Sequence, residues 1–428
     1  MNKFFFFVFY IILLEGIVMG ATIEKLEYKN KEIPLIFEKS ETLPIFNLQL
    51  VFKNSGSMID GNKKGLTSTT SKVLNEGTKK DGAINFASKL ESKAISLNSS
   101  NGFETFVIEI SCLVSEYETS LKLLNQLLKD PNLSEDTLGK IKTLQISKLK
   151  QKENDFDYVA KQNLSKIIWK NTQLENETSI ESINAIELKE VKAQLQKILN
   201  LDNLIIVVGG KIDLEKFKSD IASTIKLLKS NGETNTPKIT VAKKVATKKV
   251  KKNTEQAYIY FGSNYDIKYN DNDVYKAKVA SFILGGSGFG SRLMEEIRVK
   301  NGLAYSAYGY TSINKTHSYF TGYLQTKLEN EEKAKALVIK TINEFVENGA
   351  TLEELESAKK FLSGSEPLRS ETFSQRLGLA FNLYYKGLDQ NYPKEELKMI
   401  ESLTLEDLNS FIKSHKEMLN LSFSIVTK

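Results

Sequence analysis

The chain has 428 residues, of which 41% are hydrophobic and 26% are charged. This length accommodates two domains of ordinary size, and the composition is that of a soluble globular protein. The formal net charge of +6 is mild, and the excess lies in one lysine-rich stretch, so no general nucleic-acid-binding surface is predicted.

The first 20 residues are predicted to be a signal peptide. Lys3 supplies a positive charge, residues 4–14 form an apolar run, and Glu15 ends that run. The run is too short to cross a bilayer, which favours cleavage near Ala21 over an uncleaved anchor. We therefore expect an exported protein without a membrane span after cleavage.

A single cysteine, Cys112, excludes an intrachain disulfide. An exported chain without disulfides fits a bacterial periplasm, which is the location we expect.

Residues 21–228 predict alternating strands and helices, from period-two and helical patterning respectively. A hairpin is expected at Ile23–Phe37, with its turn at Lys29–Lys31. The other expected strands are Pro44–Lys53, Ala94–Leu97, Phe103–Leu113 and Leu204–Val208. The expected helices are Leu66–Leu74, one around Phe86–Leu90, one around Leu123–Leu128, Ser134–Gln151 and Ile186–Leu199.

Residues 229–253 interrupt this pattern. They contain Pro237 and eight lysines, without an apolar stripe at helical spacing. Such a composition is typical of a solvated linker. It separates the predicted N-terminal domain, 21–228, from the predicted C-terminal domain, 254–428.

The second half repeats features of the first. Ile180–Ile183 recurs 220 positions later as Ile400–Leu403, and Leu199–Leu201 recurs as Leu419–Leu421 with the same offset. A β-branched strand follows each copy of the second match. A shared offset in a shared context predicts a duplicated α+β domain. We expect two similar domains, each with a mixed, mostly antiparallel sheet covered by helices.

The segment 284–310 has the most specific local pattern. Four glycines form a loop, Ser291 is placed to cap the following helix, and Gly302 is placed to end it. The helix carries Arg298, and the strand that follows carries Tyr305. This arrangement is able to hold a cation beside a phenol. The ordinary alternative is a helix-surface arginine and a packed strand tyrosine.

This segment resembles the C-terminal half of the pitrilysin/insulinase metallopeptidases, in the short branch that includes the mitochondrial processing peptidase. That pattern is a glycine-rich loop, then Ser-Arg-Leu, then Arg followed by Gly-Leu-x-Tyr. It is found here at Ser291, Arg292, Leu293, Arg298, Gly302, Leu303 and Tyr305. The resemblance extends over nearly the whole mature chain and implies the two-domain plan expected above.

Active members of the family carry His-x-x-Glu-His on a helix, where two histidines bind zinc and the glutamate activates water. At the corresponding place this chain has Ser68-Thr69-Thr70-Ser71-Lys72. Hydroxyls and an ammonium are poor replacements for imidazole. The third ligand, a glutamate on a later helix, is also missing, because residues 137–152 contain no acidic residue. We predict no metal site in this chain.

Three other interpretations are weaker. Gly286-x-Gly288-x-Gly290 imitates a phosphate loop but lacks the following Lys-Ser/Thr. Ser68 or Ser71 with Lys72 imitates a Ser/Lys nucleophile pair without an oxyanion pattern. His317 and His415 are the only histidines, and each is expected to be a surface or hydrogen-bonded side chain.

The resemblance implies a silent subunit of a two-subunit zinc peptidase, with zinc held by a homologous partner. Arg298 and Tyr305 would be its catalytic contribution to a peptide or unfolded-protein substrate. The resemblance also places an edge strand for an extended peptide at residues 96–100. The implied substrate-binding residues are Gly286, Gly288, Gly290, Asn98 and Ser99. The alternative is a non-enzymatic peptide-binding or scaffolding protein with the same fold.

Overall fold

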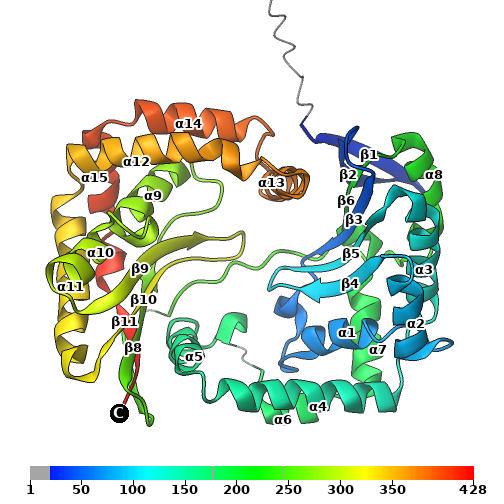
Figure 1. Cartoon of the computed structure of the whole chain (residues 1–428), viewed down its shortest axis with the longest axis horizontal. Coiled ribbons are helices and arrows are strands. Elements are labelled where there is room, and N and C mark those ends of the chain that lie inside the picture. Colours follow the sequence, from blue (N-terminus) through cyan, green and yellow to red (C-terminus); the bar gives the residue numbers. More distant parts are fainter. Residues whose placement is uncertain (1–19, 176–177, 243) are drawn as a thin grey trace, which may run out of the picture.

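A computed structural model describes residues 20–175, 178–242 and 244–428 of the protein. Residues 1–19 of the predicted signal peptide, which spans residues 1–20, lie outside these described residues. No helix in the described part of the chain combines the length and the apolar character that crossing a membrane requires. Figure 1 shows two halves side by side, each built on one sheet.

The first sheet has six strands in the order β1-β2-β6-β3-β5-β4. Only β2 and β6 pair in parallel, so the sheet is mixed and mostly antiparallel. The predicted hairpin is confirmed, and its turn residues Lys29 and Asn30 adopt positive φ. The strands are β1 (Thr22–Tyr28), β2 (Lys31–Lys39), β3 (Ile45–Lys53), β4 (Ser96–Asn101), β5 (Thr105–Leu113) and β6 (Leu204–Gly210).

The second sheet has five strands in the order β7-β11-β8-β10-β9, and only β7 and β11 pair in parallel. The two sheets have the same mixed character, which confirms the predicted α+β fold of two similar domains. The strands are β7 (Thr247–Lys251), β8 (Gln256–Asn264), β9 (Ala304–Ile313), β10 (Ser318–Lys327) and β11 (Ser422–Thr427).

Helices cover the outward face of each sheet, because their apolar stripes require burial. In the first half these are α2 (Gly82–Glu91), α3 (Tyr117–Lys129) and α8 (Leu214–Ile225). In the second half they are α9 (Val274–Ser281), α11 (Glu331–Asn348) and α15 (Leu405–Ser414). Both layers are visible at the two ends of the molecule in Figure 1.

The remaining helices lie beside these layers. α1 (Leu66–Leu74), α4 (Glu135–Lys152) and α7 (Leu188–Ile198) share an apolar cluster, and α6 (Ile180–Asn184) contacts α4. In the second half, α12 (Leu352–Ser365) packs on α14 (Tyr392–Ser402), and α10 is the short turn Arg292–Met294.

The two halves exchange one helix each across the inner faces of their sheets. α13 (Phe373–Tyr385), from the second half, packs its Phe373 and Leu377 onto β2 and β6. α5 (Phe156–Ile168), from the first half, packs its Leu164 and Ile168 onto β8 and β11. Figure 1 shows both helices in the middle of the molecule. Each sheet is therefore buried on both faces only when the two halves are joined.

An ion pair fixes α13 to the first sheet. Arg376 Nε lies 2.5 Å from Oε1 of Glu38 on β2, and Glu38 is only 2% exposed. Burial raises the pKa of Glu38, although the hydrogen bond from Arg376 acts in the opposite direction. The arginine is thus the partner that makes a buried carboxylate tolerable at neutral pH.

Arg376→Ala should lower the free energy of unfolding by about 3–5 kcal/mol at pH 7, because a buried carboxylate loses its cation. A carboxylate whose pKa is raised in the folded state binds its proton more readily there than in the unfolded chain. The destabilisation should therefore shrink as the pH falls toward 5 and Glu38 is protonated. Urea unfolding at both pH values measures this. Arg369→Ala removes an ion pair with Glu366 and a longer one, 3.8 Å, with Glu396, which keeps Lys278 as its partner at 2.5 Å. This control should cost about 1 kcal/mol or less. Equal losses for Arg376→Ala at both pH values would contradict the account.

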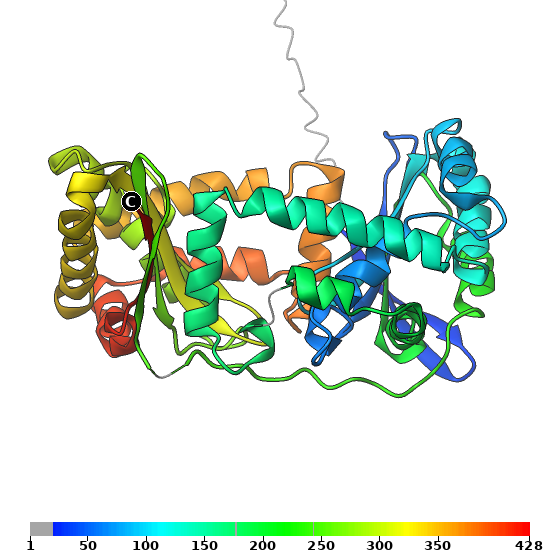
Figure 2. The same cartoon turned by 90° about the horizontal axis from the view of Figure 1, so that it is seen from below.

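The predicted linker crosses from one half to the other, and Figure 2 shows it running along one side of the molecule. Asn203 on the first half hydrogen-bonds Thr234, and Asn54 donates to the carbonyl of Thr234 at 2.5 Å. The linker also contains β7, so the second sheet begins inside the stretch expected to be solvated. The boundaries predicted for the two domains remain a prediction.

Candidate functional site

Two π-helical turns flank the glycine-rich loop of the second half. They span Phe282–Gly286 and Glu295–Lys300, with α10 between the loop and the second turn. π-helical turns are rare and often occur at functional sites. Gly302, with φ of +61°, then ends the helix and leads into β9, as predicted.

Close backbone packing holds this loop against β9. A β-carbon on Gly285 would lie 2.4 Å from the backbone nitrogen of Gly309, so the two backbones approach as only glycine permits. Gly286 ends the first π-helical turn rather than lying in the open loop. Gly288 and Gly290 have φ of +71° and +84° and form the loop itself.

The capping prediction for Ser291 is wrong in its detail. Its hydroxyl donates to the carbonyl of Gly288 at 2.7 Å and accepts no backbone N–H of the helix. The short helix is held instead by Arg292, whose Nε and Nη2 donate to the two carboxylate oxygens of Glu354 at 2.5 and 2.7 Å. This bidentate pair joins α10 to the start of α12.

Arg298 lies between two aromatic rings. The centre of its guanidinium is 4.5 Å from the ring centroid of Tyr305 and 4.6 Å from that of Phe289. Tyr305 is 82% exposed and Phe289 is 70% exposed. Within the described residues, Arg298 forms no ion pair with a carboxylate. The contacts thus fix the position of a cation and a phenol while both remain accessible.

The structure places Arg298 beside Tyr305, as the sequence pattern allowed. Phe289 was missed by the sequence analysis. The available signal was an aromatic residue between two glycines in a loop, where no core position is expected. Whether these residues contact a substrate remains a prediction.

Asn98 and Ser99 lie on β4, which is the edge strand of the first sheet. Tyr305 lies on β9, which is the edge strand of the second sheet. Figure 1 shows both edge strands on the sides of the halves that face each other. The predicted substrate-binding residues are therefore divided between two sheets.

The backbone of Ser99 already has hydrogen-bond partners on the open side of β4. Asn75 accepts from the Ser99 N–H at 2.7 Å and donates to the Ser99 carbonyl at 2.9 Å. Ser71 also contacts the Ser99 hydroxyl at 3.2 Å. An extended peptide that adds to this edge would have to displace the Asn75 amide.

The helix that corresponds to the zinc motif is α1. Lys72 Nζ donates to the Ser68 hydroxyl at 2.5 Å, and Thr69 donates to Gln145 of α4 at 3.1 Å. Burial lowers the pKa of Lys72, and the ammonium groups of Lys148 and Lys152 on α4 lower it further. Hydroxyls and converging cations do not fit a zinc ion.

Among residues 20–175, 178–242 and 244–428, no group of three or more His, Cys, Asp or Glu residues could hold a metal ion. His317 hydrogen-bonds Thr316 and packs on Trp169, and burial lowers its pKa. His415 Nδ1 lies 2.6 Å from Glu417. Both histidines are hydrogen-bonded side chains, as expected.

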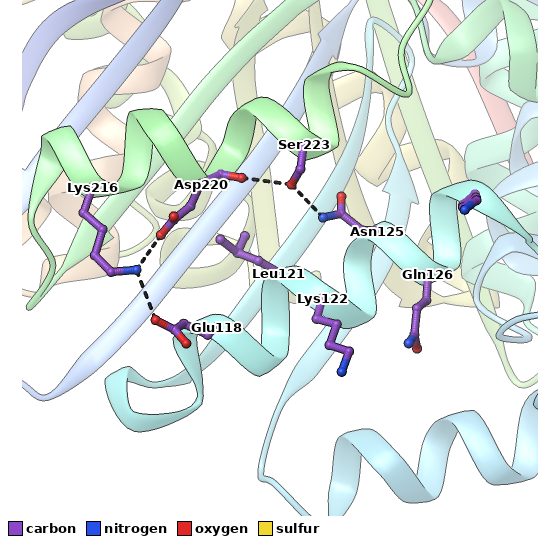
Figure 3. Close-up of a pocket in the computed structure, with 9 residues that line it drawn as sticks. Glu118, Leu121, Lys122, Asn125, Gln126, Lys216, Asp220 and Ser223 are labelled. Carbon is purple, nitrogen blue, oxygen red and sulfur yellow. Dashed lines mark hydrogen bonds and ion pairs between the residues drawn. The ribbon is translucent and has the colours of Figure 1, made fainter.

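A surface groove of about 490 Å³ lies between α3 and α8. Lys216 bridges Glu118 at 3.2 Å and Asp220 at 2.7 Å, and Asn125 donates to Ser223 at 2.9 Å. Figure 3 shows that the Lys216–Glu118 and Asn125–Ser223 pairs cross the groove, whereas Lys216 and Asp220 both belong to α8. The pairs stabilise the contact between the two helices.

Comparison with known proteins identifies the family. Residues 36–181 match the family model described as insulinase (peptidase family M16), and residues 185–362 match the one described as the peptidase M16 inactive domain. The chain is 41% identical over 424 residues to the non-peptidase homolog YmxG of Helicobacter pylori, with 98% of each chain covered. The protein therefore belongs to the peptidase M16 family, as the sequence resemblance predicted.

Two further relatives are informative. An uncharacterised zinc protease named YmxG from Bacillus subtilis is 26% identical over 264 residues, which cover 60% of this chain and 63% of that one. The crystal structure of a peptidase M16 inactive domain from Pseudomonas fluorescens superposes with a TM-score of 0.84 at 23% identity. That match covers 95% of this chain and 98% of the other, and it confirms the fold.

Restoring the motif alone should not restore zinc binding. The variant Ser68→His/Ser71→Glu/Lys72→His still lacks a third ligand and faces the ammonium of Lys148, so we expect no stoichiometric zinc in equilibrium dialysis. Adding Lys148→Glu replaces that cation by a carboxylate and should produce measurable binding. Zinc binding of equal strength by the two variants would show that α4 is not part of the obstacle.

Proposed function

We propose that this chain is the catalytically silent subunit of an exported zinc-dependent peptidase. A homologous partner subunit would carry His-x-x-Glu-His and the zinc ion. This chain would supply Arg298 and Tyr305 to a peptide or unfolded-protein substrate enclosed between the two subunits. The proposed location is the periplasm, which the predicted signal peptide and the single cysteine support.

The accessible phenol of Tyr305 beside Arg298 is the observation that carries the proposal. Aromatic side chains normally gain stability by burial, yet Tyr305 is 82% exposed and Phe289 is 70% exposed. The guanidinium between their rings limits the freedom of all three side chains. An exposed phenol of restricted orientation is suited to donate a hydrogen bond to a peptide carbonyl that develops negative charge.

The remaining residues of the proposed site have supporting roles. Gly288 and Gly290 would let the loop follow a substrate or partner surface, and Gly286 would do so at the end of its π-helical turn. Asn98 and Ser99 would contact an extended peptide along β4. At Ser99 the peptide would compete with Asn75 for the backbone.

An alternative function is peptide binding or scaffolding without any catalytic partner. Two features of the first half favour this alternative: the Asn75 contact with the backbone of Ser99, and the lysines of α1 and α4. Both are new interactions at the place of the zinc site, which a purely degraded site would not need. The two functions differ in whether a second subunit is required.

Size-exclusion chromatography of this chain with a His-x-x-Glu-His relative encoded in the same genome separates them. The proposed function requires a stable hetero-oligomer that survives pull-down. The proposal would be contradicted if this chain binds peptides by itself and forms no complex with the relative, even at concentrations well above those used for pull-down. That pair of results would favour the scaffolding function.

A further inference from the structure

The position vacated by the zinc motif holds a cluster of three lysines, which we call the α1–α4 lysine cluster: Lys72, Lys148 and Lys152. Thr69 of α1 contacts Gln145 of α4 at 3.1 Å, and this contact sets the register of the two helices. The two helices run antiparallel, because Glu76, which follows α1, pairs with Lys140 near the start of α4. Lys72 turns back along α1, and its Nζ donates to the Ser68 hydroxyl at 2.5 Å, level with the Thr69–Gln145 contact. Lys148 and Lys152 lie one and two turns beyond Gln145 on the same helical face. The Lys72 ammonium and the two lysines of α4 therefore lie at the same end of the α1–α4 pair.

None of the three lysines forms an ion pair with a carboxylate in the described part of the chain. Lys72 donates to the Ser68 hydroxyl and, at 3.5 Å, to the Ser68 carbonyl. Lys152 lies over the ring of Tyr158, with Nζ 4.5 Å from the centroid. Other lysines on the same helix have partners: Lys140 pairs with Glu76, and Lys142 donates to the carbonyl of Asn184. The cluster thus gathers three like charges without the ion pairs that other lysines of this surface form.

Convergent cations cost free energy, because each disfavours the charge of the others. The lowered pKa of Lys72, caused by burial and then by Lys148 and Lys152, reflects this cost. An anion that enters the cluster would relieve it. The site therefore has the charge and the hydrogen-bond donors to recognise carboxylates.

The neighbouring edge strand indicates what kind of molecule carries those carboxylates. Ser71, the residue before Lys72, contacts Ser99 on β4 at 3.2 Å, so the cluster lies next to the edge where an extended peptide would run. Asn75 occupies the backbone of Ser99 there. Attraction between the lysines and acidic side chains of the peptide would therefore replace part of the backbone hydrogen bonding between the peptide and β4.

We propose that the α1–α4 lysine cluster binds acidic side chains of a peptide, so that this chain selects acidic segments. This inference rests on the proposed peptide-binding function and names its substrate class. In this proposal the ammonium groups of the cluster stand where active relatives hold a zinc ion. They bind the peptide but perform no hydrolysis.

The test is fluorescence anisotropy of the isolated, mature chain with two labelled peptides of equal length. One carries Asp and Glu at alternate positions, and the other carries Asn and Gln at the same positions. We expect the Kd of the acidic peptide to be about tenfold or more below that of the amide peptide. One charge-assisted hydrogen bond is worth a difference of this size. The preference should weaken as salt is raised.

Lys72→Met and Lys148→Met should each reduce binding of the acidic peptide about tenfold and leave the amide peptide unaffected. Lys150→Met is the matched control. It removes the same charge, but Lys150 lies on the opposite face of α4. Since Lys148 is exposed, its variant keeps the test valid even if Lys72→Met folds poorly.

Equal affinity for the two peptides, or an equal loss in Lys150→Met, would overturn the acidic preference and leave the shared-subunit function untouched. Full displacement of the acidic peptide by inorganic phosphate at low millimolar concentration would show a site for small anions, and would also overturn it. Failure of the proposed function itself is seen separately, as the absence of a complex with the zinc-bearing relative.

Discussion

Tyr305→Phe should lower kcat of the reconstituted two-subunit peptidase by about 100- to 1000-fold, the usual effect of removing one oxyanion donor. The ring is retained, so its contact with Arg298 and the fold of β9 persist, and KM should change little. The measurement is steady-state hydrolysis of a quenched fluorescent peptide by the zinc-bearing relative in the presence of each variant.

Tyr310→Phe is the matched control, because Tyr310 lies on the same strand and is 41% exposed. It should retain full activity. Arg298→Lys keeps the positive charge but loses the planar group between the two rings, so it should also impair kcat. Full activity of Tyr305→Phe would remove Tyr305 from the catalytic role proposed for it.

Gly285→Ala should destabilise the second half by about 3 kcal/mol, because its β-carbon would collide with the backbone of Gly309. The contact would be 2.4 Å to nitrogen and 2.6 Å to oxygen, and neither belongs to a side chain that is able to rotate away. The π-helical turn and β9 would have to separate, which displaces the loop that leads to Arg298. Chemical denaturation measures the loss.

Gly139→Ala is the control for this effect. Gly139 lies in α4, and a β-carbon there would meet no atom within 4 Å. Alanine at that position should stabilise the protein by about 0.5–1 kcal/mol through helix propensity. A Gly285→Ala variant as stable as the wild type would show that the loop and β9 are not packed as described.

Local patterns were sufficient for most elements of the fold. The apolar alternation of Pro44–Lys53 predicted β3, and the 220-residue offset predicted the duplication. The prediction of Ala94–Leu97 was misplaced, because Ala94 has φ of +49° and belongs to the turn before β4. The rest of β4 is mostly Asn and Ser, which carry little strand signal.

Long-range pairing explains the errors that remained. β7 is lysine-rich and largely exposed, and only its parallel pairing with β11 makes it a strand. The helix pattern of α13 is readable, with Phe373, Leu377 and Ala380 on one face. The position of α13 on the sheet of the other half could not be predicted, since no local pattern encodes which surface a distant helix covers.

The candidate site was predictable in part for the same reason. Arg298 and Tyr305 are close in sequence, and a helix, a glycine and a strand between them bring them together. Phe289 completes the pair only through the turn at Gly290. The lysine cluster joins residues of α1 and α4 that are 76 or more positions apart. It could not be predicted from the sequence, because only the packing of the two helices brings these residues together.

Reconstitution of peptidase activity is the most direct test of the central claim. The mature chain is mixed with the His-x-x-Glu-His relative from the same genome, and hydrolysis of an unfolded protein is followed across a range of subunit ratios. The account predicts that activity rises until the subunits are equimolar and that a chelator abolishes it. Activity of the relative that is unchanged by this chain at every ratio would contradict the account.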